Sequence, residues 1–90
     1  MKNTRIHKTL SERQAIVVGL WFRAYTSIES SKILNISART VEEYRSRAKN
    51  KYDATNRNEL RAILQKKGEV PRLLKNTVLF MQKKEISVHG

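Results

Sequence analysis

The 90-residue sequence contains no cysteine, one proline and three glycines. Without cysteine it has no disulfide and no thiolate zinc site, which fits a reducing compartment such as the cytosol. Its three glycines form no phosphate-binding loop. The longest apolar run, residues 15–22, has eight residues, whereas a membrane-spanning helix needs about 20. We therefore expect neither an export signal nor a membrane segment.

Acidic residues and histidines are also scarce, with eight Asp and Glu and two His. His7 and His89 lie near opposite ends of the chain, and the acids show no metal-ligand spacing. A chain of this length buries about 60–65% of its unfolded surface, which leaves little room for an active-site cavity. We expect no enzymatic activity, no cofactor and no metal site.

Lysine and arginine are abundant: 19 of them give a formal net charge of +11. Such an excess on a small domain attracts polyanions and opposes self-association. Nucleic acid is the favoured partner, although charge alone also fits an acidic membrane surface, an acidic protein or simple solubility.

Apolar spacing and capping residues predict an all-α chain of five helices. Residues 1–9 carry three basic groups and no acid. They form a basic arm that is either disordered or reaches into a DNA groove. Ser11 and Gln14 form a capping box that opens a helix of about 13 residues. Its buried side is expected to carry Val17, Leu20, Trp21 and Ala24.

A second helix is predicted over residues 27–34 and a third over residues 38–52, with Ser37 as its N-cap. The core face of the third helix is Val41, Tyr44, Ala48 and Tyr52. The rest of its surface is expected to carry Arg39, Glu42, Glu43, Arg45, Ser46, Arg47, Lys49 and Asn50.

Asp53 suits a left-handed turn after the third helix. Asn56 and Glu59 then form a second capping box, and the fourth helix ends at Gly68. Pro71 opens a fifth helix, whose last residues, 86–90, are expected to fray. The apolar face of that helix carries Leu73, Leu74, Val78 and Met81.

Two short helices joined by a three-residue turn, the second of them basic, have the outline of a helix-turn-helix. B-DNA's major groove, about 12 Å wide, admits one helix. On the third helix, Arg45 with Lys49 and Arg47 with Lys51 repeat like charges four residues apart. Each such pair destabilises an isolated helix by about 0.2–0.5 kcal/mol. Phosphates would turn this repulsion into attraction; the alternative is a merely solvated face.

Three sequence blocks carry a resemblance to a known family. Residues 10–14 read Leu-Ser-Glu-Arg-Gln, residues 29–44 read Glu-Ser-Ser-Lys-Ile-Leu-Asn-Ile-Ser-Ala-Arg-Thr-Val-Glu-Glu-Tyr, and residues 51–60 read Lys-Tyr-Asp-Ala-Thr-Asn-Arg-Asn-Glu-Leu. With these blocks at this spacing, residues 10–67 resemble the LuxR-type (GerE-type) DNA-binding domain of bacterial regulators. The resemblance implies a four-helix domain whose third helix enters the major groove, followed here by a C-terminal extension, residues 68–90.

The resemblance also implies which residues touch DNA. Base contacts fall on Glu42, Glu43 and Ser46. Phosphate contacts fall on Arg39, Thr40, Arg45, Lys49, Lys51, Asn56 and Arg57. A carboxylate in the groove accepts from cytosine N4 and is repelled by guanine O6 and N7. One of the two glutamates is therefore expected to select cytosine or reject guanine, unless it only pairs with Arg47.

Several residues in the first half of the domain depart from the family pattern. Ser30 stands where the family buries an apolar residue and Ile28 where it is usually polar, so the second helix is either rotated or less tightly docked. Ala24 replaces a turn glycine. This substitution costs about 1 kcal/mol if the backbone there is left-handed, or else the first helix runs longer.

No sensor domain is expected ahead of residue 10, so control by concentration or by another protein is favoured. The apolar face of the fifth helix, Leu73, Leu74, Val78 and Met81, is a candidate dimer or partner surface; the alternative is that it covers its own core. We expect a cytoplasmic, nucleoid-associated homodimer that binds two half-sites of duplex DNA about one helical turn apart. The alternative function is an antagonist that sequesters a larger regulator. RNA binding is less favoured because few aromatics are available for base stacking.

Overall fold

The computed structural model describes residues 10–89, and the side chains of residues 10–83. Five helices make up this part of the chain: α1 (Glu12–Phe22), α2 (Ser27–Leu34), α3 (Ala38–Lys51), α4 (Arg57–Lys66) and α5 (Val70–His89). The predicted all-α class is confirmed. The basic arm expected over residues 1–9 lies outside the described residues.

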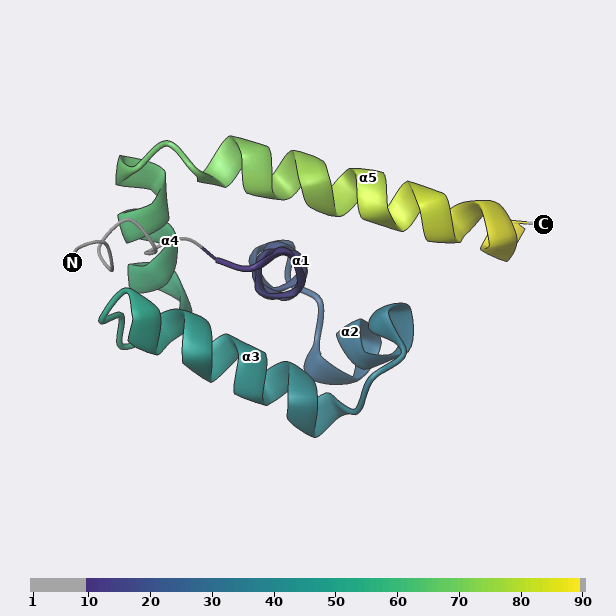
Figure 1. The fold of residues 1–90 in the computed structure, drawn as a ribbon, viewed down its shortest axis with the longest axis horizontal. Coiled ribbons are helices and arrows are strands. Elements are labelled where there is room, and N and C mark those ends of the chain that lie inside the picture. The colour runs from purple at the N-terminus through teal and green to yellow at the C-terminus, as the bar shows by residue number, and fades with distance from the viewer. Residues whose placement is uncertain (1–9, 90) are drawn as a thin grey trace.

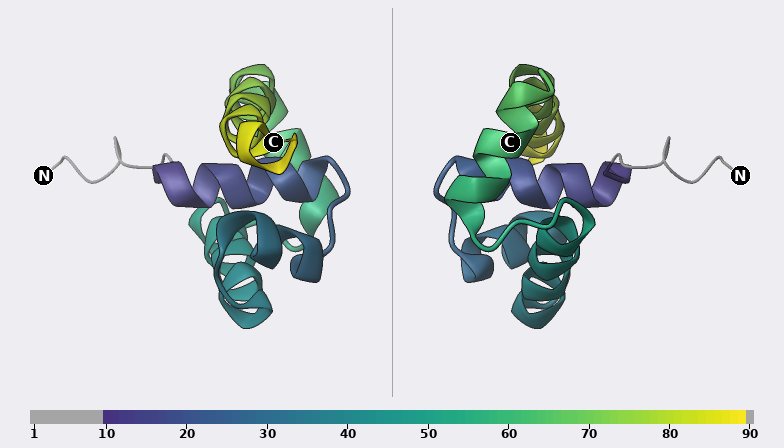
Figure 2. Two further views of the ribbon diagram at one scale, coloured as in Figure 1. Left: turned by 90° about the vertical axis from the view of Figure 1, so that its right-hand side faces the viewer. Right: turned by 90° about the vertical axis from the view of Figure 1, so that its left-hand side faces the viewer.

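Helix α1 lies at the centre of the molecule. Figure 1 looks nearly along it, with α5 on one side, α3 on the other, and α4 and α2 at the two flanks. In the side views of Figure 2, α1 separates α5 from the α2–α3 pair. Because α1 is surrounded in this way, it is apolar on nearly all sides. It contributes Val18 and Phe22 to one core cluster and Ile16, Val17 and Leu20 to another.

Short polar side chains begin the helices as the sequence predicts. The capping box of Ser11 and Gln14 is present, and Ser37 Oγ accepts from the backbone N–H of Thr40 at 3.0 Å. Asn56 caps α4, but the Glu59 carboxylate accepts from the N–H of Thr55 rather than from that of Asn56. The second capping box is therefore only half as predicted.

A left-handed residue follows each of the first four helices, and after α2 it is Asn35, with φ of 59°. Asp53 and Gly68, with φ of 56° and 73°, adopt the conformation expected of them. Ala24 also has a positive φ, 71°, and it is exposed. Its expected place on the buried side of α1 is therefore wrong. The helix has 11 residues rather than about 13, because the backbone turns at the position of the family's glycine.

Helix α2 keeps its predicted bounds and is not rotated. Ser30 is fully buried, and Ile28 is 61% exposed. The Ser30 hydroxyl has no hydrogen-bond partner. A rotated helix would have placed Ile28 inside and Ser30 outside. The other alternative, less tight docking, therefore remains, because a serine replaces an apolar residue in the contact. A feature that the sequence analysis missed is a capping box between Thr26 and Glu29 at the start of this helix.

Helix α5 folds back on α1, and part of its apolar face covers the core, which was the alternative to a dimer or partner surface. Leu73 is 6% exposed and belongs to a core cluster. Leu74 and Met81 pack against the core, and Val78 is half-buried. The helix also continues to His89, past the point where fraying was expected.

Candidate nucleic-acid interface

Helix α3 lies along one edge of the molecule, on the side of α1 opposite α5 (Figure 1). Val41 and Ala48 are fully buried, Tyr52 is nearly so, and Tyr44 packs partly buried against the core. The predicted core face is therefore confirmed. It anchors the helix to α1 and α2 and leaves the opposite face to solvent.

The outer face of α3 is polar. Its exposed residues are Arg39, Glu42, Glu43, Ser46, Arg47 and Asn50. Arg39, Glu43, Ser46 and Asn50 recur at helical spacing and form the ridge farthest from Val41. The structure therefore leaves all three expected base-contacting residues accessible, with Glu42 beside the ridge on the flank toward α2.

The ion pairs on this face differ from the predicted one. Arg39 Nε lies 3.7 Å from Glu43 Oε2. Arg47 lies over the Tyr44 ring, with its guanidinium carbon 5.9 Å from the centroid. Neither glutamate pairs with Arg47, so the alternative that one of them only forms this ion pair is wrong.

Arg45 is not on the outer face, contrary to the prediction. It is 8% exposed. Nη2 donates to the Tyr25 carbonyl at 2.9 Å, Nη1 donates to Ser27 Oγ at 3.1 Å, and the guanidinium carbon lies 4.9 Å from the Trp21 ring centroid. Burial lowers the pKa of the guanidinium, and nearby Glu42 opposes that shift. Both terminal nitrogens donate to groups of the protein itself. The expected position of Arg45 on the DNA-facing surface, as a phosphate contact, is therefore wrong.

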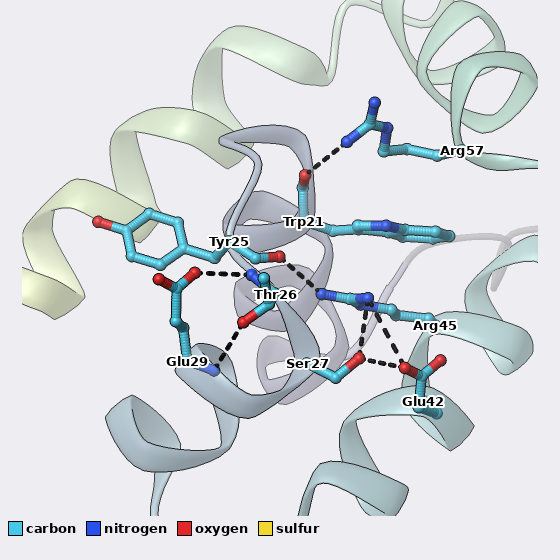
Figure 3. A network of polar contacts seen from close by, with 8 residues as sticks. All are labelled: Trp21, Tyr25, Thr26, Ser27, Glu29, Glu42, Arg45 and Arg57. Carbon is cyan, nitrogen blue, oxygen red and sulfur yellow. Dashed lines mark hydrogen bonds and ion pairs between the residues drawn. The ribbon is translucent and has the colours of Figure 1, made fainter.

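Ser27, the first residue of α2, contacts α3 at a second point. Its hydroxyl donates to Glu42 Oε2, which also lies 4.0 Å from Arg45 Nη1. Figure 3 shows the Arg45 guanidinium between the Trp21 ring and the Ser27 and Glu42 side chains. Ser27 was not among the predicted site residues. Its partners lie 15 and 18 residues away, so no local pattern marks it.

The other expected phosphate contacts occupy several positions. Arg39 and Thr40 lie in the first turn of α3, and Asn56 and Arg57 at the start of α4. The Arg57 Nη1 donates to the Trp21 carbonyl at 3.4 Å. Lys49 and Lys51 are half-buried near the end of α3, and Lys51 Nζ donates to Gln14 Oε1 at 3.4 Å. The first turns of α3 and α4 thus offer the more exposed cations.

Among the described residues, no three His, Cys, Asp or Glu side chains are close enough to hold a metal ion. No helix within residues 10–89 is long and apolar enough to cross a membrane.

One comparison with known proteins gave a match. The sequence model of the bacterial regulatory proteins of the luxR family (GerE) matches residues 8–64, more than half of the chain. No curated protein and no solved structure matches. The matched span contains the whole outer face of α3 and ends before α5 begins.

Proposed function

The chain belongs to the luxR family of bacterial regulatory proteins and is therefore a DNA-binding transcription regulator, and we propose that it binds duplex DNA by placing α3 in the major groove. The observation that carries this proposal is the exposed polar ridge of α3, held rigidly at an edge of the molecule by Val41 and Ala48. A helix presented in this way fits a groove about 12 Å wide. The protein would act in the cytoplasm, at the nucleoid.

The proposed contacts divide into two classes. Glu42, Glu43 and Ser46 face base edges, and a glutamate there favours cytosine over guanine. The proposed phosphate contacts are Arg39, Thr40, Lys49, Lys51, Asn56 and Arg57. Phosphate contacts fix the register of the protein on DNA without reading sequence.

We further propose that the protein binds DNA as a homodimer on two half-sites. The net charge of +11 opposes association of free copies. Bound DNA neutralises part of this positive charge and so weakens the repulsion between the two copies. Sedimentation of the protein with and without a two-half-site duplex tests this point. A single bound copy per duplex at saturation would refute the dimer.

The alternative function is capture of a larger regulator through α5. Less apolar surface is available for it than the sequence suggested, because the inner face of α5 packs against the core. One observation still supports it: Leu79 is 47% exposed beside a groove that Leu10, Ile16 and Phe80 line.

The test of the proposed function is selection of binding sites from random duplex DNA by the purified protein at about physiological salt. Specific binding should exceed non-specific binding by at least about 10³. We expect a two-fold symmetric site, and a changed base preference with at least one of Glu42→Ala and Glu43→Ala. Lys75→Ala, an exposed position on α5, is the matched control and should select the wild-type site. Absence of any enriched site would refute sequence recognition by α3 and favour the alternative.

A further inference from the structure

Two adjacent glutamates on α3 are held very differently. Glu43 pairs with Arg39 at 3.7 Å, and the two side chains are 53% and 88% exposed. Exposed ion pairs of this kind confer little order, because water competes and both side chains lose rotamer freedom. The Glu42 side chain is itself 62% exposed, but it is bonded to Ser27 and close to Arg45, whose side chain is only 10% exposed. Only Glu42 is tied to the protein interior.

The anchor of this arrangement is the Arg45 guanidinium. The Tyr25 carbonyl and the Ser27 hydroxyl accept from its two terminal nitrogens, and the Trp21 ring covers it. Trp21 lies in the last turn of α1, Tyr25 in the loop that follows, and Ser27 is the first residue of α2. A planar group held by partners in fixed directions loses its freedom to reorient. Arg45 therefore fixes the start of α2 relative to α3.

Ser27 transmits this constraint to Glu42. An arginine side chain only donates and an ionised carboxylate only accepts, whereas a hydroxyl does both. Because Arg45 donates to Ser27 Oγ, the hydroxyl proton is free to point only away from it, toward Glu42 Oε2. The direction of the whole relay, from Arg45 through Ser27 to Glu42, is thus determined.

We propose that Ser27 and Arg45 are positioning residues that hold Glu42 as an oriented, charge-compensated hydrogen-bond acceptor for a base edge. The second carboxylate oxygen, Oε1, is then the one directed to the groove. The cation behind it offsets the repulsion that phosphates exert on a bare carboxylate. This inference rests on the proposed function and assigns base selectivity to Glu42 rather than to Glu43.

The test uses the full chain and the duplex obtained by site selection, with every base pair of one half-site replaced in turn. Glu42→Ala identifies the base pair that Glu42 reads, by a loss of about tenfold in discrimination at that pair. Ser27→Ala removes only the hydroxyl, at a half-buried helix-start position where alanine is well tolerated. Ser27→Thr keeps the hydroxyl and is the matched control. Melting temperature and affinity for an unrelated duplex are measured for each protein.

We expect Ser27→Ala to reduce discrimination about three- to tenfold at the Glu42 base pair alone, with unchanged affinity for the unrelated duplex. The melting temperature should fall slightly, because Arg45 Nη1 loses an acceptor. Ser27→Thr should keep the wild-type discrimination. The double variant Ser27→Ala/Glu42→Ala should match Glu42→Ala, because Ser27 acts through Glu42. A Ser27→Ala protein with full discrimination, or with equal losses at every base pair, would overturn the proposal.

Failure of the proposed function gives a different result. In that case the wild-type protein itself shows no preference at any base pair, and the relay has nothing to orient. If the wild type discriminates but Glu43→Ala rather than Glu42→Ala abolishes the discrimination, the proposed function stands and the assignment to Glu42 is wrong.

Discussion

Ala24 occupies a conformation that its side chain disfavours. Its φ of 71° is left-handed, and its side chain is exposed. A left-handed residue with a Cβ costs about 1–2 kcal/mol, whereas glycine there loses about 0.4–1 kcal/mol through the entropy of the unfolded chain. We expect Ala24→Gly to raise the free energy of unfolding by about 0.5–1 kcal/mol, measured by urea titration.

The matched control for this substitution is Ala62→Gly, because Ala62 is an exposed residue inside α4. Glycine in a right-handed helix interior lowers stability by about 1 kcal/mol relative to alanine. The same chemical change should therefore have opposite signs at the two sites. If both variants are destabilised alike, the left-handed turn at Ala24 is not where the strain lies.

Glu59 gives the molecule a specific response to acid. The hydrogen bond from the Thr55 backbone lowers the pKa of this carboxyl below its ordinary value of 4.5. A lowered pKa in the folded state contributes stability above pH 4.5, and that contribution is lost as the pH falls through the folded value. We expect Glu59→Gln to be less stable than wild type at pH 7, with the difference shrinking on acidification. Parallel unfolding curves between pH 7 and pH 3 would contradict this.

Single residues show where sequence reasoning works and where it does not. Ser11 and Ser37 were predictable as caps because capping depends on neighbours three residues away. Arg45 was misplaced, although it lies four residues after Val41 and three before Ala48 and so shares their buried face. The helical spacing placed Arg45 on the buried face. It was nevertheless predicted to be exposed because of its charge, since arginine is seldom buried. The partners that allow its burial are distant in sequence, at the end of α1, in the loop after it and at the start of α2.

At the scale of elements, the contact between α1 and α5 depends on a missing side chain. A Cβ added at Gly19 would lie 1.8 Å from Thr77 Oγ1 and 3.0 Å from Thr77 Cβ. Thr77 is itself fully buried and donates to the Leu73 carbonyl at 2.8 Å. The glycine therefore permits close approach of the two helices and buries Thr77 and Leu73 between them.

Gly19→Ala should lower the free energy of unfolding by about 1–3 kcal/mol, the usual effect of overpacking a core. On helix propensity alone the same change would stabilise α1 by about 1 kcal/mol. The sign of the change in unfolding free energy therefore distinguishes overpacking from propensity. Thr77→Ala removes the nearest atom and should reduce the penalty, with a coupling of at least about 0.5 kcal/mol in a double-mutant cycle. Additive losses in the cycle would show that α5 does not pack on α1 at this point.

The same contact explains which elements could be placed from the sequence. The bounds of α2, the turn after it and the N-cap of α3 follow from local residues and from the family pattern. The docking of α5 did not follow, because an apolar face at Leu73 and Leu74 fits a core and an interface equally well. The absence of a side chain at Gly19 allows α5 to pack on α1 and so favours the core. The sequence alone does not show that the two helices meet at this residue.

At the scale of the whole molecule, the positive charge affects folding and binding in opposite ways. A net charge of +11 repels itself in the compact state. Salt screens this repulsion, since the Debye length falls from about 30 Å at 0.01 M to about 3 Å at 1 M. Salt also competes with the protein for phosphates. Added sodium chloride should therefore raise the melting temperature of the free protein and weaken its binding to DNA.

The binding arm of this prediction locates the DNA-facing side. The logarithm of the affinity should fall linearly with that of the salt concentration, with a slope of about −0.9 per neutralised phosphate. Arg39→Ala, on the outer face of α3, should make the slope less steep by about one unit. Lys75→Ala, equally exposed but on α5, should leave it unchanged. The two substitutions remove the same charge, so net charge alone predicts equal changes in the salt slope. Binding through α3 predicts a change in slope only for Arg39→Ala. A change in slope for Lys75→Ala instead would place the DNA against α5.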